Sequence, residues 1–192
     1  LMTSGGGLTT LETAARFPIR LVESGPAGGA ILAREVARGA GLERVLSFDM
    51  GGTTAKLCLI DDFEPLTSRS FEVDRVYRFR KGSGLPVRIP VIEMVEIGAG
   101  GGSVAQVDKL GRIQVGPESA GSEPGPAAYG RGGDRPTVTD ADLQLGRVCA
   151  RTFAGGAFEL DTEASVKALE VRVADPLGLE PDLAAFGVSE VV

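Results

Sequence analysis

The clearest pattern of apolar and polar positions lies in two short runs, residues 44–48 and 55–60, which are rich in strand-forming side chains. Each run is too short for a helix, and a Gly-Gly pair stands between them. We therefore predict a β-hairpin whose tight turn is Gly51-Gly52.

Similar patterns predict the other strands. A run at residues 66–73 predicts a third strand after the hairpin, and residues 104–107 and 113–115 predict a second hairpin. Residues 116–133 contain too much proline and glycine for regular structure, so we expect an ordered loop there.

Four helices are predicted from period and cap residues. Ser24 to Pro26 has the chemistry of a helix start, and we expect a helix over residues 27–37 that glycines close. Thr139 and Asp142 have the spacing of a capping box for a helix through residue 147. A third helix is expected over residues 164–173, stopped by Pro176, and a fourth from Pro181.

This order of elements predicts an α/β fold in one domain. The chain opens directly in a Gly-rich loop and stops at Val192 in what reads as the middle of a helix, so we expect a piece of a larger protein. Residues 1–41 form a loop and a helix, and residues 42–115 form a strand-rich core. Residues 116–136 are the glycine- and proline-rich loop, and residues 137–192 form a helical part.

The octapeptide 49–56 has the residue types of a phosphate-binding turn. Adjacent glycines can take positive φ and carry no Cβ, so that successive N–H groups can converge on an anion. Asp49 suits a hydrated Mg²⁺ ion beside the phosphates. Thr53 and Thr54 add hydroxyl donors, and Lys56 offers a compensating charge. An ordinary hairpin is the alternative, because tight turns use the same residues.

A second glycine cluster, EIGAGGGS at residues 96–103, comes before a strand-like run. Glycine inside regular structure costs about 0.5–1 kcal/mol relative to alanine, so this density needs a reason. A loop lying flat against a purine or a ribose is one reason, and a flexible linker is another. The apolar flanks Val95, Ile97 and Val104 favour the loop that faces a ligand.

Composition narrows the function classes. The 192 residues carry a net charge of -6, which argues against nucleic-acid binding. No apolar stretch reaches the roughly 20 residues of a membrane span, so a cytoplasmic protein is expected. The sequence contains no histidine, which excludes Ser/His/Asp or Cys/His catalysis by this chain alone. Cys58 lies in an apolar strand and is expected to be a buried thiol.

Two further groups of charges have a structural and a functional interpretation. Asp140 and Asp142 could be catalytic carboxylates, although helix capping explains Asp142 more simply. Residues 75–88 are locally basic and are more typical of a solvated face than of an anion site; the basic residues are Arg75, Arg78, Arg80, Lys81 and Arg88.

Several strings, in this order, resemble the hydantoinase A/5-oxoprolinase family and within it the N-methylhydantoinase A branch. The resemblance runs nearly end to end. The strings are TSGGGL (3–8), SGPAGG (24–29), FDMGGTTAK (48–56), EIGAGGGSVAQVD (96–108), VGPESAGSEPGPAAYGRGG (115–133) and PTVTDADLQLG (136–146).

The resemblance implies an actin-like ATPase lobe of the ribonuclease H type, with a mixed sheet and flanking helices. It implies ATP and Mg²⁺ as cofactors, Asp49 as the catalytic and metal-binding carboxylate, and a hydantoinase B-type companion subunit, with a homo-oligomer possible. The nucleotide would be bound by Gly51, Gly52, Thr53, Thr54, Lys56, Gly98, Gly100, Gly101, Gly102 and Ser103.

The activity implied is ATP-dependent opening of a cyclic amide such as hydantoin, N-methylhydantoin or 5-oxoproline. The same family contains ATP-dependent carboxylases of ketones such as acetone and acetophenone, which are the alternative. A non-catalytic actin-like scaffold that binds nucleotide is an alternative of another class. A carbohydrate kinase would need a base for the acceptor hydroxyl, and no residue here has that pattern.

Overall fold

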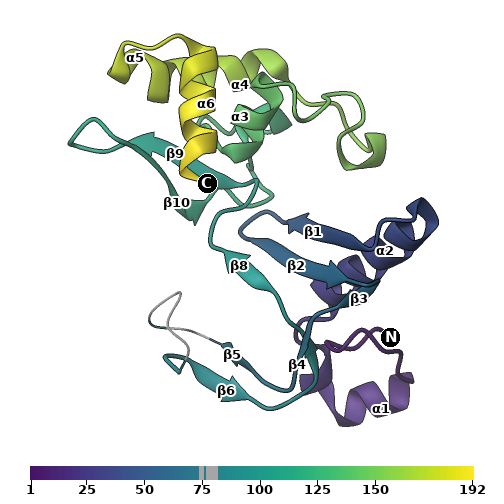
Figure 1. The fold of residues 1–192 in the computed structure, drawn as a ribbon. Helices are drawn as coiled ribbons and strands as arrows, with labels where there is room; N and C mark the ends of the chain where they lie inside the picture. Colours follow the sequence, from purple (N-terminus) through teal and green to yellow (C-terminus); the bar gives the residue numbers. More distant parts are fainter. Residues whose placement is uncertain (74–75, 77–81) are drawn as a thin grey trace. The chain divides into compact units, whose positions relative to one another are not determined.

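The computed structural model describes residues 1–73, 76 and 82–192. The chain forms two compact units, which are described one at a time (Figure 1). The first contains Leu1–Asp49 and Lys56–Glu96, and the second contains Met50–Ala55 and Ile97–Val192. The basic residues Arg75, Arg78, Arg80 and Lys81 lie outside the described residues.

The first unit starts with two short helical segments and one long helix. These are α1 (Leu11–Arg16), the 3-10 turn η1 (Pro18–Leu21) and α2 (Ser24–Ala40). Helix α2 starts earlier than the predicted residue 27, so Ser24 lies inside the helix and is not its cap. The expected glycine stop is confirmed, because Gly41 caps α2 in the left-handed conformation at φ 68°.

The predicted first hairpin is confirmed. Strands β1 (Arg44–Met50) and β2 (Ala55–Asp61) pair in one sheet, which β3 (Glu64–Pro65) extends and in which β8 (Val95–Ile97) also pairs with β2. Helix α2 packs against this sheet, with Ala27 and Ala30 beside Cys58 and Ile60 in one apolar cluster.

The predicted single strand over residues 66–73 is wrong. Two separate strands, β4 (Thr67–Ser68) and β5 (Phe71–Val73), cover it and have different partners. Strand β4 pairs with β7 (Val91–Ile92), and β5 pairs with β6 (Leu85–Val87). A bend at Arg69 separates the two strands, and the Ser68 hydroxyl donates across it to the Ser70 carbonyl at 2.8 Å.

The second unit contains an antiparallel hairpin with helices packed on it (Figure 1). Its strands are β9 (Ser103–Val107) and β10 (Ile113–Ser119), joined by the predicted turn. The helical segments, in order, are η2 (Ala127–Tyr129), α3 (Val138–Gln144), η3 (Phe153–Gly156), α4 (Thr162–Leu169), η4 (Glu170–Ala174), α5 (Asp175–Leu177) and α6 (Pro181–Val191).

Two sequence predictions about these helices need correction. Pro176 does not stop the third predicted helix, because a π-helical segment, η4, joins α4 to α5 and the left-handed Gly178 ends the run. The capping box of α3 uses Thr137 and Asp140 and not Thr139 and Asp142. Both threonine–aspartate pairs have the same spacing, so the sequence allowed either register.

Among the residues that the structure describes, no helix is both long enough and apolar enough to cross a bilayer.

Candidate nucleotide-binding turn and its support

The segment at residues 51–54 joins β1 to β2 and belongs to the second unit. The Gly51 N–H donates to the Thr54 carbonyl at 2.9 Å and closes a four-residue turn. Contrary to the sequence prediction, neither Gly51 nor Gly52 has a positive φ. A two-residue primed turn needs positive φ, whereas this four-residue turn does not.

The glycine loop at residues 98–103 binds this turn through its backbone. Gly101 N–H donates to the Gly51 carbonyl at 2.9 Å, and Gly102 N–H donates to the Gly52 carbonyl at 2.8 Å. The structure therefore brings together the two glycine motifs that the sequence singled out, within one compact unit.

Close packing explains why two loop positions, Gly100 and Gly102, carry no side chain. A Cβ at Gly100 would lie 2.6 Å from the Gly51 carbonyl oxygen and from the Thr53 and Thr54 nitrogens. A Cβ at Gly102 would lie 2.8 Å from the carbonyl oxygen of Gly52. Real Cβ atoms do not approach backbone so closely, so the turn and the loop fit only because these positions are glycine.

The remaining loop contacts fix it to the rest of the second unit. Ser103 is buried, and its hydroxyl accepts from the Gly100 N–H at 2.9 Å. The carbonyl of Gly101 accepts from the Thr139 N–H at 2.8 Å, at the start of α3. These contacts make the 98–103 loop an ordered part of the core and exclude a flexible linker. Gly98 is exposed, whereas a Cβ at Gly101 would lie 2.8 Å from the Thr139 hydroxyl.

Three backbone N–H groups of the turn have no hydrogen-bond acceptor among the described residues. Across the described part of the chain, no group accepts from the backbone N–H of Gly52, Thr53 or Thr54. Gly52 is exposed, and a Cβ there would meet no atom within 4 Å. The Thr53 and Thr54 nitrogens lie on the side of the turn that faces Gly100. Adjacent backbone donors without acceptors are typical of an anion-binding turn.

Asp49 is the last residue of the first stretch of the first unit and is exposed near the end of β1. Its carboxylate lies 3.6 Å from the position that a Cβ on Gly29 of α2 would occupy. Among the described residues, no group of three or more metal-binding side chains gathers around it or elsewhere.

Lys56 is engaged by two carboxylates of the first unit. Its ammonium lies 3.3 Å from a Glu23 oxygen and 3.1 Å from a Glu96 oxygen. Burial acts to lower the pKa of Lys56, but the hydrogen bonds and charges of Glu96 and Glu23 outweigh it and raise that pKa. The charge of Lys56 is thus already compensated within the protein.

Asp140 is a structural support that sequence reasoning placed among possible catalytic residues. Its fully buried carboxylate accepts from the backbone N–H of Ala128 and of Thr137, both at 2.7 Å, and from the Thr137 hydroxyl at 2.8 Å. Burial raises the pKa of this carboxyl, although the hydrogen bonds act to lower it. These bonds hold the start of α3, from which Thr139 supports the 98–103 loop.

The chain is thus a mixed α/β protein in which a glycine loop holds a turn with free amide donors. The sequence matches the profile of the hydantoinase/oxoprolinase family over residues 1–192, and the chain belongs to that family.

Two curated relatives illustrate the match. "Uncharacterized protein MJ0964" of Methanocaldococcus jannaschii is 41% identical over 191 residues, which cover 98% of this chain and 28% of the relative. "Caprolactamase subunit alpha" of Pseudomonas jessenii is 36% identical over 189 residues, 98% of this chain and 26% of the relative. The chain therefore spans about a quarter of the length of these relatives.

Two solved structures are also similar to this chain. A nucleotide-free acetone carboxylase, from work on ATP-dependent acetone carboxylation, is similar with a TM-score of 0.72 and 32% identity, covering 99% of this chain and 25% of that one. The ATP-dependent caprolactamase from Pseudomonas jessenii has a TM-score of 0.68 and 35% identity, covering 91% and 24%. The family thus includes ATP-dependent enzymes of two reaction types.

Proposed function

We propose that this chain supplies the phosphate-binding turn of an ATP site in an enzyme that opens cyclic amides. The observation that carries the proposal is the set of unused N–H groups at Gly52, Thr53 and Thr54, on a turn that the 98–103 loop holds in place. Such donors stabilise phosphate oxygens without a charged side chain.

The other predicted residues have roles consistent with this site. The exposed carboxylate of Asp49 suits a hydrated Mg²⁺ ion, which prefers oxygen ligands and keeps several waters. The hydroxyls of Thr53 and Thr54 would add donors for phosphate oxygens. The loop from Gly98 to Ser103 is proposed to lie on the adenosine side, where Gly98 is exposed. Lys56 would reach a phosphate only by giving up its pairs with Glu23 and Glu96.

ATP supplies a phosphoryl group that would activate the amide oxygen, so that water can attack an otherwise unreactive carbonyl. The protein's own contribution is to position phosphate oxygens with fixed backbone dipoles, which need little reorganisation during the reaction. We place the chain in an actin-like lobe of the ribonuclease H type. The turn and loop would form one side of the nucleotide site, and a longer polypeptide would complete it.

The companion is proposed to be a hydantoinase B-type subunit. The name "Caprolactamase subunit alpha" indicates a multi-subunit enzyme in that relative. Residues 1–192 by themselves are expected to bind ATP weakly and to turn over no substrate, because they would provide only part of the donors and metal ligands.

An ATP-dependent ketone carboxylase is the second candidate. The similarity to acetone carboxylase, with the TM-score of 0.72, favours it as much as the caprolactamase similarity favours the hydrolase. Because both reactions would use the same ATP site, the turn does not discriminate between them.

The test is phosphate release from ATP by the whole natural polypeptide with its companion subunit. Hydantoin, N-methylhydantoin, 5-oxoproline, caprolactam and acetophenone with bicarbonate are compared. A cyclic-amide hydrolase releases phosphate only with one of the amides. Stimulation by the ketone alone supports the carboxylase instead. Asp49→Asn should abolish most of the stimulated release, and full activity in that variant would refute the metal role.

A further inference from the structure

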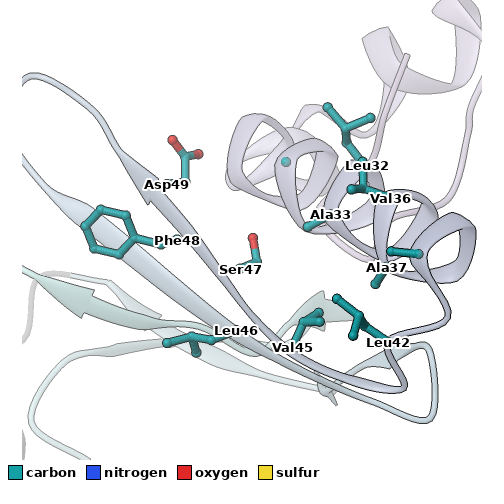
Figure 2. A pocket seen from close by; sticks show the side chains of 12 residues that line it. Leu32, Ala33, Val36, Ala37, Leu42, Val45, Leu46, Ser47, Phe48 and Asp49 are labelled. Atoms are coloured by element: carbon teal, nitrogen blue, oxygen red, sulfur yellow. The ribbon is translucent and has the colours of Figure 1, made fainter. Parts of the chain in front are cut away.

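A groove of about 530 Å³ runs between α2 and β1 within the first unit (Figure 2). Its lining is mostly apolar, with Ser47 and Asp49 of β1 as the polar side chains; the apolar side chains that define it are Leu32, Val36, Ala37, Leu42 and Val45. Leu32 and Val36, four residues apart on one face of α2, are 66% and 65% exposed. Helix α2 therefore presents a second apolar stripe that no described part of the chain covers.

Strand β1, beside this groove, carries Val45, Ser47 and Asp49 on the face toward α2 and Leu46 and Phe48 on the opposite face. Figure 2 shows Val45 on the side that faces α2, whereas Leu46 and Phe48 point away from it. Leu46 and Phe48 are each 56% exposed. The face away from α2 is therefore apolar and uncovered by any described part of the chain, which is unusual for a sheet face that meets only water.

The edge of β1 is also open. Within the described ranges β1 pairs with β2 alone, although it is seven residues long. Natural edge strands are protected by lysine, proline, a bulge or short length, and β1 has none of these between Arg44 and Asp49.

The groove and the open edge fit one kind of occupant. Another strand would lie about 4.8 Å from β1, and its side chains would alternate between the two faces. Side chains on one face would cover Leu32 and Val36, and those on the other would extend the surface of Leu46 and Phe48. A helix or a small molecule could fill the groove, but neither would satisfy the backbone groups along the edge of β1.

We propose that a β-strand from the same polypeptide, outside residues 1–192, pairs with the open edge of β1 and fills this groove. The lengths of the relatives favour this source. The matched region covers 28% and 26% of their chains, so about three quarters of each is available to supply a strand and the elements beyond it. The inference does not depend on which reaction the enzyme performs.

Hydrogen exchange in the whole natural polypeptide tests the proposal. The outward N–H groups of residues 45–48 should exchange at least about 100-fold more slowly than unpaired amides, as paired core strands do. Leu32→Glu should speed this exchange and lower the melting temperature. The matched control Leu110→Glu, at a residue that is 75% exposed in the β9–β10 turn, should change neither.

Three outcomes would overturn the proposal. The first is fast exchange of these amides in wild-type polypeptide, which needs no variant to fold. The second is protection that appears only when the polypeptide dimerises, which would assign the edge to a second copy. The third is protection that appears only when the companion subunit is added.

Discussion

At the scale of single residues, Gly52 is the most informative position. Gly100 and Gly102 are explained by contacts within the protein, whereas a Cβ at Gly52 would meet nothing and its φ is not positive. Nothing in the folded chain itself requires glycine there. A bound phosphate would require it.

Gly52→Ala should therefore leave stability nearly unchanged but weaken nucleotide binding by the whole polypeptide by at least about tenfold, a free-energy change near 1.4 kcal/mol. Titration calorimetry with ATP and Mg²⁺ measures this. Gly39→Ala, in α2, also has an open Cβ position and a φ that is not positive, and it should bind as wild type does. Equal affinity in the two variants would argue against a phosphate at Gly52.

The different reactivities expected of the two cysteines provide a test of the fold. Cys58 is buried, and burial raises the pKa of its thiol. Cys149 is exposed, and hydrogen bonds from Thr152 and Arg151 lower the pKa of its thiol. Because the thiolate reacts, iodoacetamide should label Cys149 below the pH at which a free cysteine reacts. Cys58 should label only on unfolding; rapid labelling of both in native protein would contradict the described core.

At the scale of elements, the start of α3 links structure to the proposed site. Asp140 fixes Thr137 and Ala128, and the next turn of backbone carries Thr139 to the 98–103 loop. Asp142, by contrast, forms a pair with Arg147 at 3.4 Å near the surface.

Asp140→Asn should destabilise the protein by about 2–3 kcal/mol, because the buried N–H donors of Thr137 and Ala128 lose a carboxylate acceptor. Asp142→Asn should cost less than about 1 kcal/mol, as expected for a surface pair. Urea denaturation of both variants makes the comparison. If the two variants lost equal stability, or if Asp142→Asn lost more, the capping box would be Thr139–Asp142, as predicted from the sequence, and not Thr137–Asp140.

Some of these helices and strands could be predicted from the sequence and others could not. The hairpin β1–β2, the turn between β9 and β10 and the start of α6 at Pro181 were predicted, because alternation and cap residues determine them locally. The division of residues 66–73 depends on distant partners, β7 and β6, which local patterns do not contain. The capping register at Thr137 is set by the buried contact of Asp140 with Ala128, twelve residues away.

The candidate site, too, was predicted from the sequence only in part. Residue types identified both glycine motifs, but only the structure shows that they contact each other and that the contacts explain Gly100 and Gly102. The pairing of Lys56 with Glu23 and Glu96 spans 33 and 40 positions and has no local signal.

At the scale of the whole molecule, the chain corresponds to about a quarter of the relatives it matches. Its open apolar surfaces at β1 and α2 are consistent with a piece that packs against further structure. The proposed ATP chemistry and the proposed added strand both belong to that larger protein, and they fail independently of each other.

The most direct test of the central claim is a crystal structure of the whole polypeptide with a non-hydrolysable ATP analogue and Mg²⁺. The account predicts phosphate oxygens about 3 Å from the backbone nitrogens of Gly52, Thr53 and Thr54. A triphosphate bound elsewhere, with these nitrogens facing protein or solvent, would contradict it.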